Sequence, residues 1–516
     1  MPSVLAPPVP VLPGTATSWP LHGLAASRAI EQASLAGLPP HTLMHRAGTA
    51  VARLALAVAP HAQHIWIAAG PGNNGGDGLQ AAIALQAAGK RVSVSLLAAP
   101  ERLPPDARDA YERARQAGVP IEHTAVPTSA CELGIDALLG LGSNRPVQGE
   151  IGAAVDALNR LEAPVLAVDL PSGLQAQTGA LLGGPVVHAD HTLCLLSLKP
   201  GLFTGLGRDH AGRVWLSHLG NQADAPAEAW LSGSDGLAEL MPLRRHAQHK
   251  GSFGDTVVVG GATGMEGAAW LAARAALCAG AGRVYLDLLG GHAGFAGPPE
   301  LMCRPGLVMS RPQDLAKSTV VCGCGGGNAV GTVLLAVLEH SARLVLDADA
   351  LNTIAADASL QQQLARRHAQ RLPTLLTPHP LEAARLLGCD AATVQADRFR
   401  AAAALADRLA CAVLLKGSGS VCAAPGQPPQ VNPTGNALLA SAGTGDVLAG
   451  WAAGLWSQQP RSDVDSSAEA QVVGAGAAWL HGQAADAAQA AGRAMPLTAS
   501  TLIDAMVAEA TILARR

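Results

Sequence analysis

Asp446 follows a short run of small residues, Gly443-Thr444-Gly445, and an apolar helical pattern comes after it. Backbone N–H groups at such a helix start can hold phosphate oxygens or a developing oxyanion. A carboxylate in the first helical turn is stabilised as an anion, so it can serve as a general base or a metal-side ligand. An ordinary helix start gives the same short pattern, and the segment alone leaves both interpretations open.

Polar or glycine-rich segments end four buried strand patterns elsewhere in the second half. The strand pattern in 319–328 is followed by glycines, that in 343–349 by two carboxylates, that in 374–382 by a histidine and that in 412–420 by a lysine. Alternating strands and helices predict a parallel sheet. Simpler interpretations exist: Asp347 and Asp349 as helix caps, His379 as a packed turn residue and Lys416 as a solvated loop charge. Their combination with the 443–446 segment favours a binding site.

The first half shows a similar arrangement. A strand pattern over 65–69, a glycine-rich loop over 70–78, a helix over 79–88 and a strand over 91–97 predict one right-handed βαβ unit. The glycine spacing matches the dinucleotide fingerprint, but the second strand lacks the closing acidic residue that holds a ribose. We therefore expect no ordinary dinucleotide cofactor there. Asn73, Asn74 and Asp77 can instead offer oxygens to a cation or to ligand hydroxyls.

Two further strand patterns of the first half carry carboxylates. Asp136 lies at a strand that leads into a glycine-rich loop with Arg145, and Asp169 ends the strand pattern 164–169, followed by Ser172. The carboxyl ends of strands build the site in an open α/β sheet. Turn chemistry explains one strand-end Asp, whereas three polar strand ends together favour a site.

Size and composition limit the alternatives. A chain of 516 residues predicts two domains. With 49% hydrophobic but only 3% aromatic residues, the core must consist of Ala, Val and Leu. A net charge of -4 gives no basic field for nucleic acid. No apolar run approaches the length of a membrane span, and no cationic segment precedes an apolar one at the N-terminus, as a secretory signal requires.

The remaining candidate metal ligands do not form a recognisable zinc pattern. The nine cysteines lack zinc spacing, so we expect free thiols in a reducing cytoplasm. His41 and His45 lie four residues apart, and we interpret them as surface or capping residues because no third ligand is visible. Residues 1–18 resemble a disordered Pro-rich leader, and helical spacing of apolar residues predicts helices over 24–36 and 43–58.

The Asn73–Gly78 segment, the Asp136 loop and Val168–Gly173 resemble the NAD(P)H-hydrate epimerase family over roughly residues 24–220. This family forms the N-terminal half of a bifunctional nicotinamide-nucleotide repair enzyme. The resemblance implies that Asp169 is catalytic and that Asn74, Asp136 and Ser172 bind potassium. His45 stands where the family usually has Glu. The implied substrate-binding residues are Asn73, Asn74, Gly75, Gly76, Asp77, Gly140, Leu141, Gly142, Ser143, Asn144, Arg145, Pro146 and Asp169.

The segments His249–Gly254, Asp347–Leu351, Leu376–Pro380, Leu415–Gly417 and Asn432–Gly450 resemble the ADP-dependent NAD(P)H-hydrate dehydratase family, which has a ribokinase-like fold. The match covers roughly residues 235–515. Cys324 lies where that family usually has Pro, in Gly323–Gly327, and Leu381 replaces a common Gly. The resemblance implies a catalytic Asp446, a hydrate site and a nucleotide site. The implied hydrate-binding residues are Ala268, Gly325, His379 and Asp446, and the nucleotide-binding residues are Lys416, Gly417, Ser418, Gly419, Ser420 and Gly445.

The sequence therefore predicts an α/β protein with a Rossmann-like three-layer domain over residues 1–222 and a ribokinase-like domain over residues 223–516. The first would interconvert R and S hydrates of NADH and NADPH, and the second would dehydrate the S hydrate with ADP, giving AMP and phosphate. We expect potassium in the first domain, Mg²⁺ with ADP in the second, and ADP as co-substrate. We also expect a cytoplasmic homo-oligomer with small-molecule substrates and neither nucleic-acid nor membrane partners.

Two other functions fit parts of the pattern. One is a ribokinase-like small-molecule kinase fused to a non-catalytic nucleotide-binding scaffold, which would leave a persistent phosphorylated product. The other is a nicotinamide dehydrogenase, which the absent ribose-binding acid disfavours.

Overall fold

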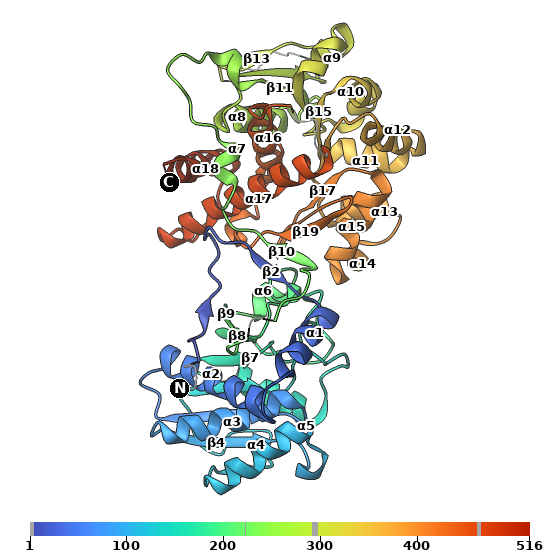
Figure 1. The fold of residues 1–516 in the computed structure, drawn as a ribbon. Coiled ribbons are helices and arrows are strands. Elements are labelled where there is room, and N and C mark those ends of the chain that lie inside the picture. Colours follow the sequence, from blue (N-terminus) through green and yellow to red (C-terminus); the bar gives the residue numbers. More distant parts are fainter. Residues whose placement is uncertain (1–4, 222, 292–297, 462–465, 516) are drawn as a thin grey trace. The chain divides into compact units, whose positions relative to one another are not determined.

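The computed structural model describes residues 5–221, 223–291, 298–461 and 466–515. They form two compact units, the first built from residues up to Leu12 with Pro20–Ala229, the second from Pro13–Trp19 with Trp230 onward (Figure 1). The units divide between Ala229 and Trp230. The boundary expected from the sequence lies at 222–223, and residue 222 is outside the described residues.

The predicted disordered leader is wrong where the structure describes it, from residue 5 onward; residues 1–4 lie outside the described residues. Strand β1 (Val9–Pro10) pairs antiparallel with β9 (Arg213–Ser217). Backbone N–H groups of Ser234 and Asp235 donate to the carbonyls of Thr15 and Ala16. Pairing with distant backbone groups orders a segment that has no apolar periodicity of its own.

The first unit is a three-layer α/β fold. Its sheet has the order β1-β9-β8-β7-β6-β3-β4-β5, and every pairing but that of β1 is parallel. Helices α2, α3 and α4 share a core with one face and α5 with the other. The elements are β3 (His64–Ala69), β4 (Arg91–Leu96), β5 (Ile121–Glu122), β6 (Leu133–Ala137), β7 (Val165–Val168), β8 (His191–Leu195), α1 (Leu24–Leu35), α2 (Thr42–Val58), α3 (Asn73–Ala87), α4 (Pro105–Gln116) and α5 (Gly149–Asn159).

Helix α3 begins at Asn73, whereas the sequence predicted a loop over residues 70–78. A Cβ at Gly75 would lie 2.1 Å from the Gly70 carbonyl oxygen, and one at Gly76 would lie 2.7 Å from Met44 Cε. Glycine disfavours helix in isolation. Here it lets the first turns of α3 pack directly on neighbouring backbone, and this tertiary contact outweighs the local preference.

The second unit is also α/β. Its sheet has the order β13-β12-β11-β14-β15-β16-β17-β18-β19-β10-β2. Pairing is parallel from β13 to β17, and β18 joins its two neighbours antiparallel. The strands are β2 (Trp19–Leu21), β10 (Ala229–Leu231), β11 (Asp255–Gly260), β12 (Arg283–Leu288), β13 (Met302–Cys303), β14 (Ser318–Cys322), β15 (Arg343–Leu346), β16 (Thr374–Leu376), β17 (Ala412–Leu415), β18 (Val421–Ala424) and β19 (Gln427–Val431).

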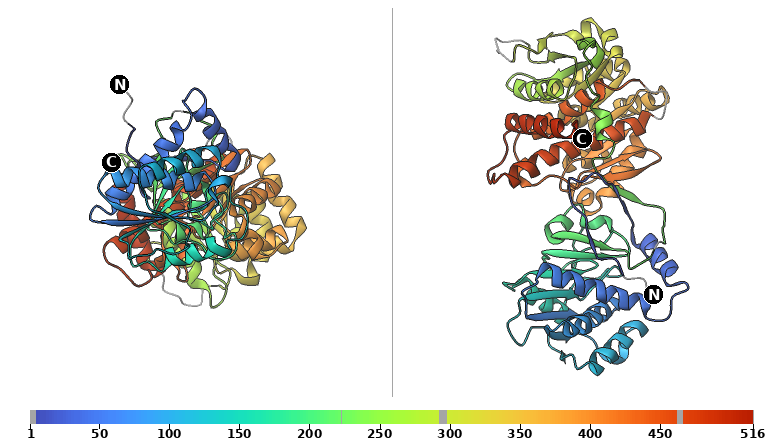
Figure 2. Two further views of the ribbon diagram at one scale, coloured as in Figure 1. Left: turned by 90° about the horizontal axis from the view of Figure 1, so that it is seen from below. Right: turned by 60° about the vertical axis from the view of Figure 1, so that its left-hand side comes forward.

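Helices cover both faces of this second sheet. Figures 1 and 2 show the red C-terminal helices and green α8 on one face, and the yellow to orange helices on the other. Ala, Val and Leu make up most of the core in both layers, as predicted, but four tryptophans, Trp270, Trp451, Trp456 and Trp479, also pack into the first. The first set comprises α8 (Glu266–Cys278), α16 (Thr444–Ser457), α17 (Ser466–Ala490) and α18 (Ala499–Leu513); the second includes α10 (Leu334–His340), α11 (Ala348–Ala356), α12 (Ala358–Ala369), α13 (Pro380–Leu387) and α15 (Arg398–Leu409).

Close packing of α8 against α16 positions the start of α16. A Cβ at Gly450 would lie 2.0 Å from the Ala272 carbonyl oxygen, and one at Gly454 would lie 2.3 Å from that of Ala276. The two helix backbones therefore touch without side chains between them. This contact holds the Gly443–Asp446 segment near the carboxyl ends of the parallel strands.

Candidate active sites

A pocket of about 490 Å³ opens in the first unit beside strand ends of β6, β7 and β8. It contains eight of the residues expected at the substrate: Asn73, Asn74, Asp77, Gly140, Leu141, Gly142, Ser143 and Asp169. The expected residues Gly75 and Gly76 instead pack α3 against its neighbours. Asn144, Arg145 and Pro146 are exposed and do not line the pocket.

Asp169 lies directly after β7 and has a φ of 68°, a left-handed conformation that is strained for a residue with a side chain. Its carboxylate accepts a hydrogen bond from the Lys199 ammonium and another from the Leu195 amide at 3.3 Å. The Lys199 side chain is 2% exposed. A buried charge pair needs close partners to offset its desolvation, so the two groups hold each other at the pocket wall.

Sequence reasoning did not assign Lys199 or Glu31 to this site. Lys199 had one signal, as one of the chain's five lysines and followed by Pro-Gly. Glu31 on α1 lines the same pocket. Burial and the nearby Asp169 carboxylate raise the pKa of Glu31. The pocket therefore combines four carboxyl groups, those of Glu31, Asp77, Asp106 and Asp169, with the buried Lys199 ammonium.

Two of the expected potassium ligands are in contact. The Ser172 hydroxyl donates to Asp136 at 2.6 Å, and the Ser172 amide donates to the other carboxylate oxygen at 2.8 Å. Burial raises the pKa of Asp136 to about 6, against the opposing effect of these hydrogen bonds. Asn74, the third expected ligand, lies beside Gly140, and its Nδ2 atom has no hydrogen-bond partner in the described part of the chain.

The histidine pair predicted to be surface or capping has no metal-binding geometry in the described ranges. His41 Nδ1 lies 2.6 Å from Asp106 Oδ1, and His41 is the residue before α2. Neither His41 nor His45 belongs to a group of described residues that could hold a metal ion.

The second unit brings together residues from four segments around Asp446. Asp446 lies in the first turn of α16, whose N-cap Gly443 has a φ of 87°. One ligand atom each from Asp446, Asp347 and Cys324 lies within 4.8 Å of the others. Burial and the Asp347 carboxylate raise the pKa of Asp446 to about 6, while the Cys324 thiol and the Lys416 ammonium lower it. Such a carboxyl can exchange protons near neutral pH.

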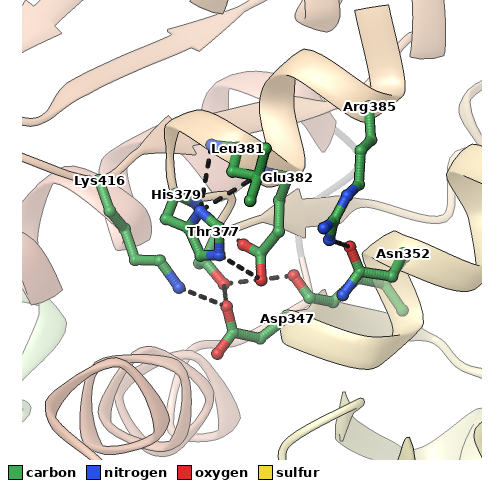
Figure 3. Close-up of polar contacts among 9 residues, drawn as sticks. Asp347, Asn352, Thr377, His379, Leu381, Glu382, Arg385 and Lys416 are labelled. Atoms are coloured by element: carbon green, nitrogen blue, oxygen red, sulfur yellow. Dashed lines mark hydrogen bonds and ion pairs between the residues drawn. The ribbon is translucent and has the colours of Figure 1, made fainter. Parts of the chain in front are cut away.

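Lys416 is not a solvated loop charge. Its Nζ atom lies 2.6 Å from Asp347 Oδ1, which also accepts a hydrogen bond from Thr377 at 2.8 Å (Figure 3). Burial alone would lower the pKa of Lys416, but Asp347 and Glu382 raise it, so the ammonium stays charged. A Cβ at Gly445 would lie 3.4 Å from Lys416 Nζ. The ammonium therefore faces the start of α16, where phosphate oxygens can bind.

The two carboxylates after β15 do not cap α11 with their side chains. Asp347 occupies the N-cap position without a side-chain cap, because its carboxylate binds Lys416 and Thr377. Asp349 instead accepts a hydrogen bond from the Gly327 amide at 2.8 Å. Asp349 thus holds the glycine loop after β14 in place.

His379 is a capping residue. Its Nδ1 atom accepts from the Leu381 amide at 3.1 Å, and Glu382 Oε2 accepts from the His379 amide at 2.8 Å (Figure 3). This reciprocal pattern is a capping box at the start of α13. Burial and the Lys416 charge lower the pKa of His379, and its side chain is 46% exposed.

The other expected residues lie in the first turn of α8 and in the loops after β14 and β17. A Cβ at Gly325 would lie 2.9 Å from Ala268 Cβ, so these two predicted hydrate-binding residues are neighbours. Gly417 and Gly419 have φ values of 138° and 59°, and the Ser420 hydroxyl donates to the Gly417 carbonyl at 3.1 Å. The Arg398 guanidinium donates hydrogen bonds to the carbonyls of Leu415 and Lys416, and these bonds hold the start of this loop in place. Ser418 lies between the two glycines of the same loop.

No helix among the described residues is long and apolar enough to cross a bilayer. The group Cys324, Asp347 and Asp446 is the one set of possible metal ligands in those residues. The Lys416 ammonium lies against Asp347 of this group and neutralises part of its negative charge.

Comparison with known proteins accounts for both units. The family model described as YjeF-related protein N-terminus matches residues 40–201, and the NAD(P)H-hydrate dehydratase model matches residues 256–507. A ribokinase-like superfamily protein of Enterococcus faecalis is similar in structure, with 22% identity, 57% of this chain and 100% of that chain covered, and a TM-score of 0.46.

Two relatives match both units together. The bifunctional NAD(P)H-hydrate repair enzyme of Escherichia coli is 36% identical over 88% of this chain and 87% of its own length. The enzyme of the same name from Coxiella burnetii is 35% identical over 90% of this chain and 94% of its own length. With such similarity over nearly the whole chain, this protein belongs to the family of bifunctional NAD(P)H-hydrate repair enzymes, with an epimerase domain followed by a dehydratase domain.

Proposed function

We propose that Asp446 is the base of an ADP-dependent dehydration that restores NADH and NADPH from their S hydrates. Hydroxide is a poor leaving group, whereas phosphate leaves readily. Asp446 would take the proton of the ring hydroxyl. The hydroxyl oxygen would at the same time bond to the terminal phosphorus of ADP, and AMP would leave. Loss of phosphate with its bonding electrons, and of a proton from the adjacent ring carbon, then restores the double bond.

The single observation that carries this proposal is the environment of Asp446. Its carboxyl has a pKa of about 6 and lies at a helix start, close to the Lys416 ammonium. The ammonium and the amides of Gly443–Gly445 can stabilise charge on a transferring phosphoryl group. One cluster thus combines a base with a helix start that can bind phosphate. This combination favours a site for phosphoryl transfer to a hydroxyl over a site that only binds a nucleotide.

The nucleotide would lie over the loop Gly417–Ser420 and beside Gly445, with Lys416 facing its phosphates. Mg²⁺ with the nucleotide would neutralise phosphate charge. Asp347 and Asp349 are engaged by Lys416, Thr377 and the Gly327 amide. The ion would therefore be held chiefly by phosphate oxygens and water, which Mg²⁺ commonly retains, and we assign no side chain to it.

In the first unit, Asp169 would act on the hydrate ring during epimerisation, with Lys199 fixing the position of the carboxylate. Asn74, Asp136 and Ser172 would hold potassium. Asp136 supports this assignment because it is fully buried without a cationic side-chain partner among the described residues. Hard oxygen donors suit such an ion, whose charge would offset the buried carboxylate.

The test is ADP-dependent recovery of reduced-nicotinamide absorbance from S-hydrated NADPH. Asp446→Asn should lose roughly 10²–10⁴-fold in turnover, the usual scale for a positioned base, with little change in ADP affinity. Asp357→Asn at the N-cap of α12 is the matched control, because Asn caps a helix as well as Asp does. If folded Asp446→Asn keeps a rate within a few-fold of wild type, Asp446 is not the base. A phosphorylated hydrate that persists would instead indicate a kinase.

A further inference from the structure

Cys324 lies in the glycine loop that follows β14, and its side chain is fully buried. The loop geometry holds it in place. Its neighbours Gly323 and Gly325 have φ values of 120° and 58°, and the Cys324 carbonyl accepts a hydrogen bond from the Gly261 amide at 3.0 Å. These backbone contacts fix the position of Cys324 in the loop.

The thiol of Cys324 points at the carboxylates of the dehydratase site. One oxygen each of Asp347 and Asp446 lies within 4.8 Å of its sulfur and of one another. Burial and the two carboxylates raise the pKa of the Cys324 thiol well above its usual range. Cys324 thus stays protonated, so that its S–H group can donate a hydrogen bond to the Asp446 carboxylate.

Asp446 has few other means of orientation. Its carboxylate faces Asp347 and Asp349, which repel it, and Lys416, which attracts it. The Lys416 ammonium is already committed to Asp347 at 2.6 Å. The thiol is therefore the neighbour that can direct the carboxylate without competing for the substrate proton.

We propose that Cys324 is a positioning residue of the dehydratase, whose S–H group holds the Asp446 carboxylate in its reactive orientation. This inference rests on the proposed role of Asp446. The sulfur takes no part in bond making or breaking, because the proton leaves the hydrate hydroxyl for the carboxylate. The donor stabilises the ionised, base-competent form of Asp446 and extends its activity toward lower pH.

The test compares the pH dependence of kcat/KM for ADP-dependent dehydration in Cys324→Ala, Cys324→Ser and Cys322→Ala. A hydrogen bond to a carboxylate changes its ionisation by roughly tenfold. In Cys324→Ala the acid limb of the kcat/KM profile should therefore move about one pH unit higher. At pH values below this limb, kcat/KM should be roughly tenfold lower than in wild type. Cys324→Ser retains a donor and should keep the limb near wild type. The ionisation of ADP affects every variant alike.

Cys322→Ala is the matched control, because Cys322 is also fully buried two residues earlier but has its pKa raised by burial and Asp287, with no contribution from Asp446. An unchanged limb in Cys324→Ala, an equal shift in Cys322→Ala, or an equal shift in Cys324→Ser would each overturn the positioning role. Failure of Asp446→Asn to lose activity would instead overturn the proposed function.

A second measurement keeps the inference testable if Cys324→Ala does not fold. The S–H stretching band of Cys324 can be assigned in the infrared spectrum by its disappearance in Cys324→Ser. Removal of the acceptor in Asp446→Ala should shift that band to higher frequency. A band that does not move in folded Asp446→Ala would show that no hydrogen bond joins the two residues.

Discussion

Replacement of Lys416 by Met should destabilise the second unit and weaken ADP binding together. The Asp347 side chain is 2% exposed and that of Lys416 is 18% exposed. Methionine fills much of the space of the lysine stem but leaves the Asp347 carboxylate buried beside Asp446 without its counterion. Breaking a buried ion pair by removing one partner costs about 3–5 kcal/mol. We take about 3 kcal/mol, the lower end, because the ammonium is partly exposed.

The same change acts on nucleotide binding and on the base. Loss of a charged donor facing phosphate should raise the KM for ADP by roughly tenfold or more. Lys416 also lowers the pKa of Asp446, so the acid limb of the rate profile should move to higher pH. Urea unfolding followed by tryptophan fluorescence measures the stability, because most of the tryptophans lie in the second unit. Initial rates at varied ADP measure the binding.

The double variant Asp347→Asn with Lys416→Met separates the two effects. Asparagine still accepts the Thr377 hydrogen bond but carries no charge, so the uncompensated buried carboxylate is gone. Stability should return to within about 1 kcal/mol of wild type, since replacing both members of a buried pair is often nearly neutral. The KM for ADP should stay high, because the ammonium that faces the phosphates is absent in both variants.

Three results would refute this reasoning. A loss below about 1 kcal/mol in Lys416→Met would place the pair among surface salt bridges, which contribute little. A double variant as unstable as the single one would show that the cost does not come from the unpaired carboxylate. An unchanged KM for ADP in both variants would remove Lys416 from the nucleotide site.

Three further predictions concern both units. Asp169→Asn should leave repair of the S hydrate intact and strand the R hydrate after the non-enzymatic rate is subtracted; wild-type consumption of both epimers would contradict its role. Replacing potassium by tetramethylammonium should slow epimerisation while dehydration of pure S hydrate serves as the control, and unchanged epimerisation would count against the site. Burial lowers the pKa of His481 to about 4, so the unfolded chain binds a proton first and stability should fall by about 3 kcal/mol as pH drops from about 6.5 to about 4. His481→Gln, which can still donate to the Thr444 carbonyl, should show a shallower loss of stability in urea over that range, and an equal slope would refute the assignment.

Much of the fold followed from local patterns. The parallel strands were predicted because buried apolar runs alternate with helical spacing, and that pattern has few other solutions. The polar residues at strand ends were predicted to converge because parallel strands bring their carboxyl ends to one edge. Asp347 and Lys416 do meet in this way, and the start of α16 brings Asp446 to them. The roles assigned to the individual residues remain predictions.

Other features depended on partners far away in the sequence. Glycines made the Asn73–Gly78 segment resemble a loop, yet the contacts of Gly75 and Gly76 make it the start of α3. The Pro-rich N-terminal segment is ordered by pairing with residues more than 200 positions later. Local propensity carries no information about either contact.

The sequence by itself determined the chemical groups of this protein: its strand-end carboxylates, its glycine loops and a lysine near each site. Tertiary structure alone decided which groups became partners. It joined Lys199 to Asp169, turned Asp347 from a helix cap into the counterion of Lys416, and placed the Cys324 thiol against Asp446. The physical reason is that a buried charge or donor takes its partner from whatever packing brings within hydrogen-bond distance, and that packing is set by helices and strands distant in the chain.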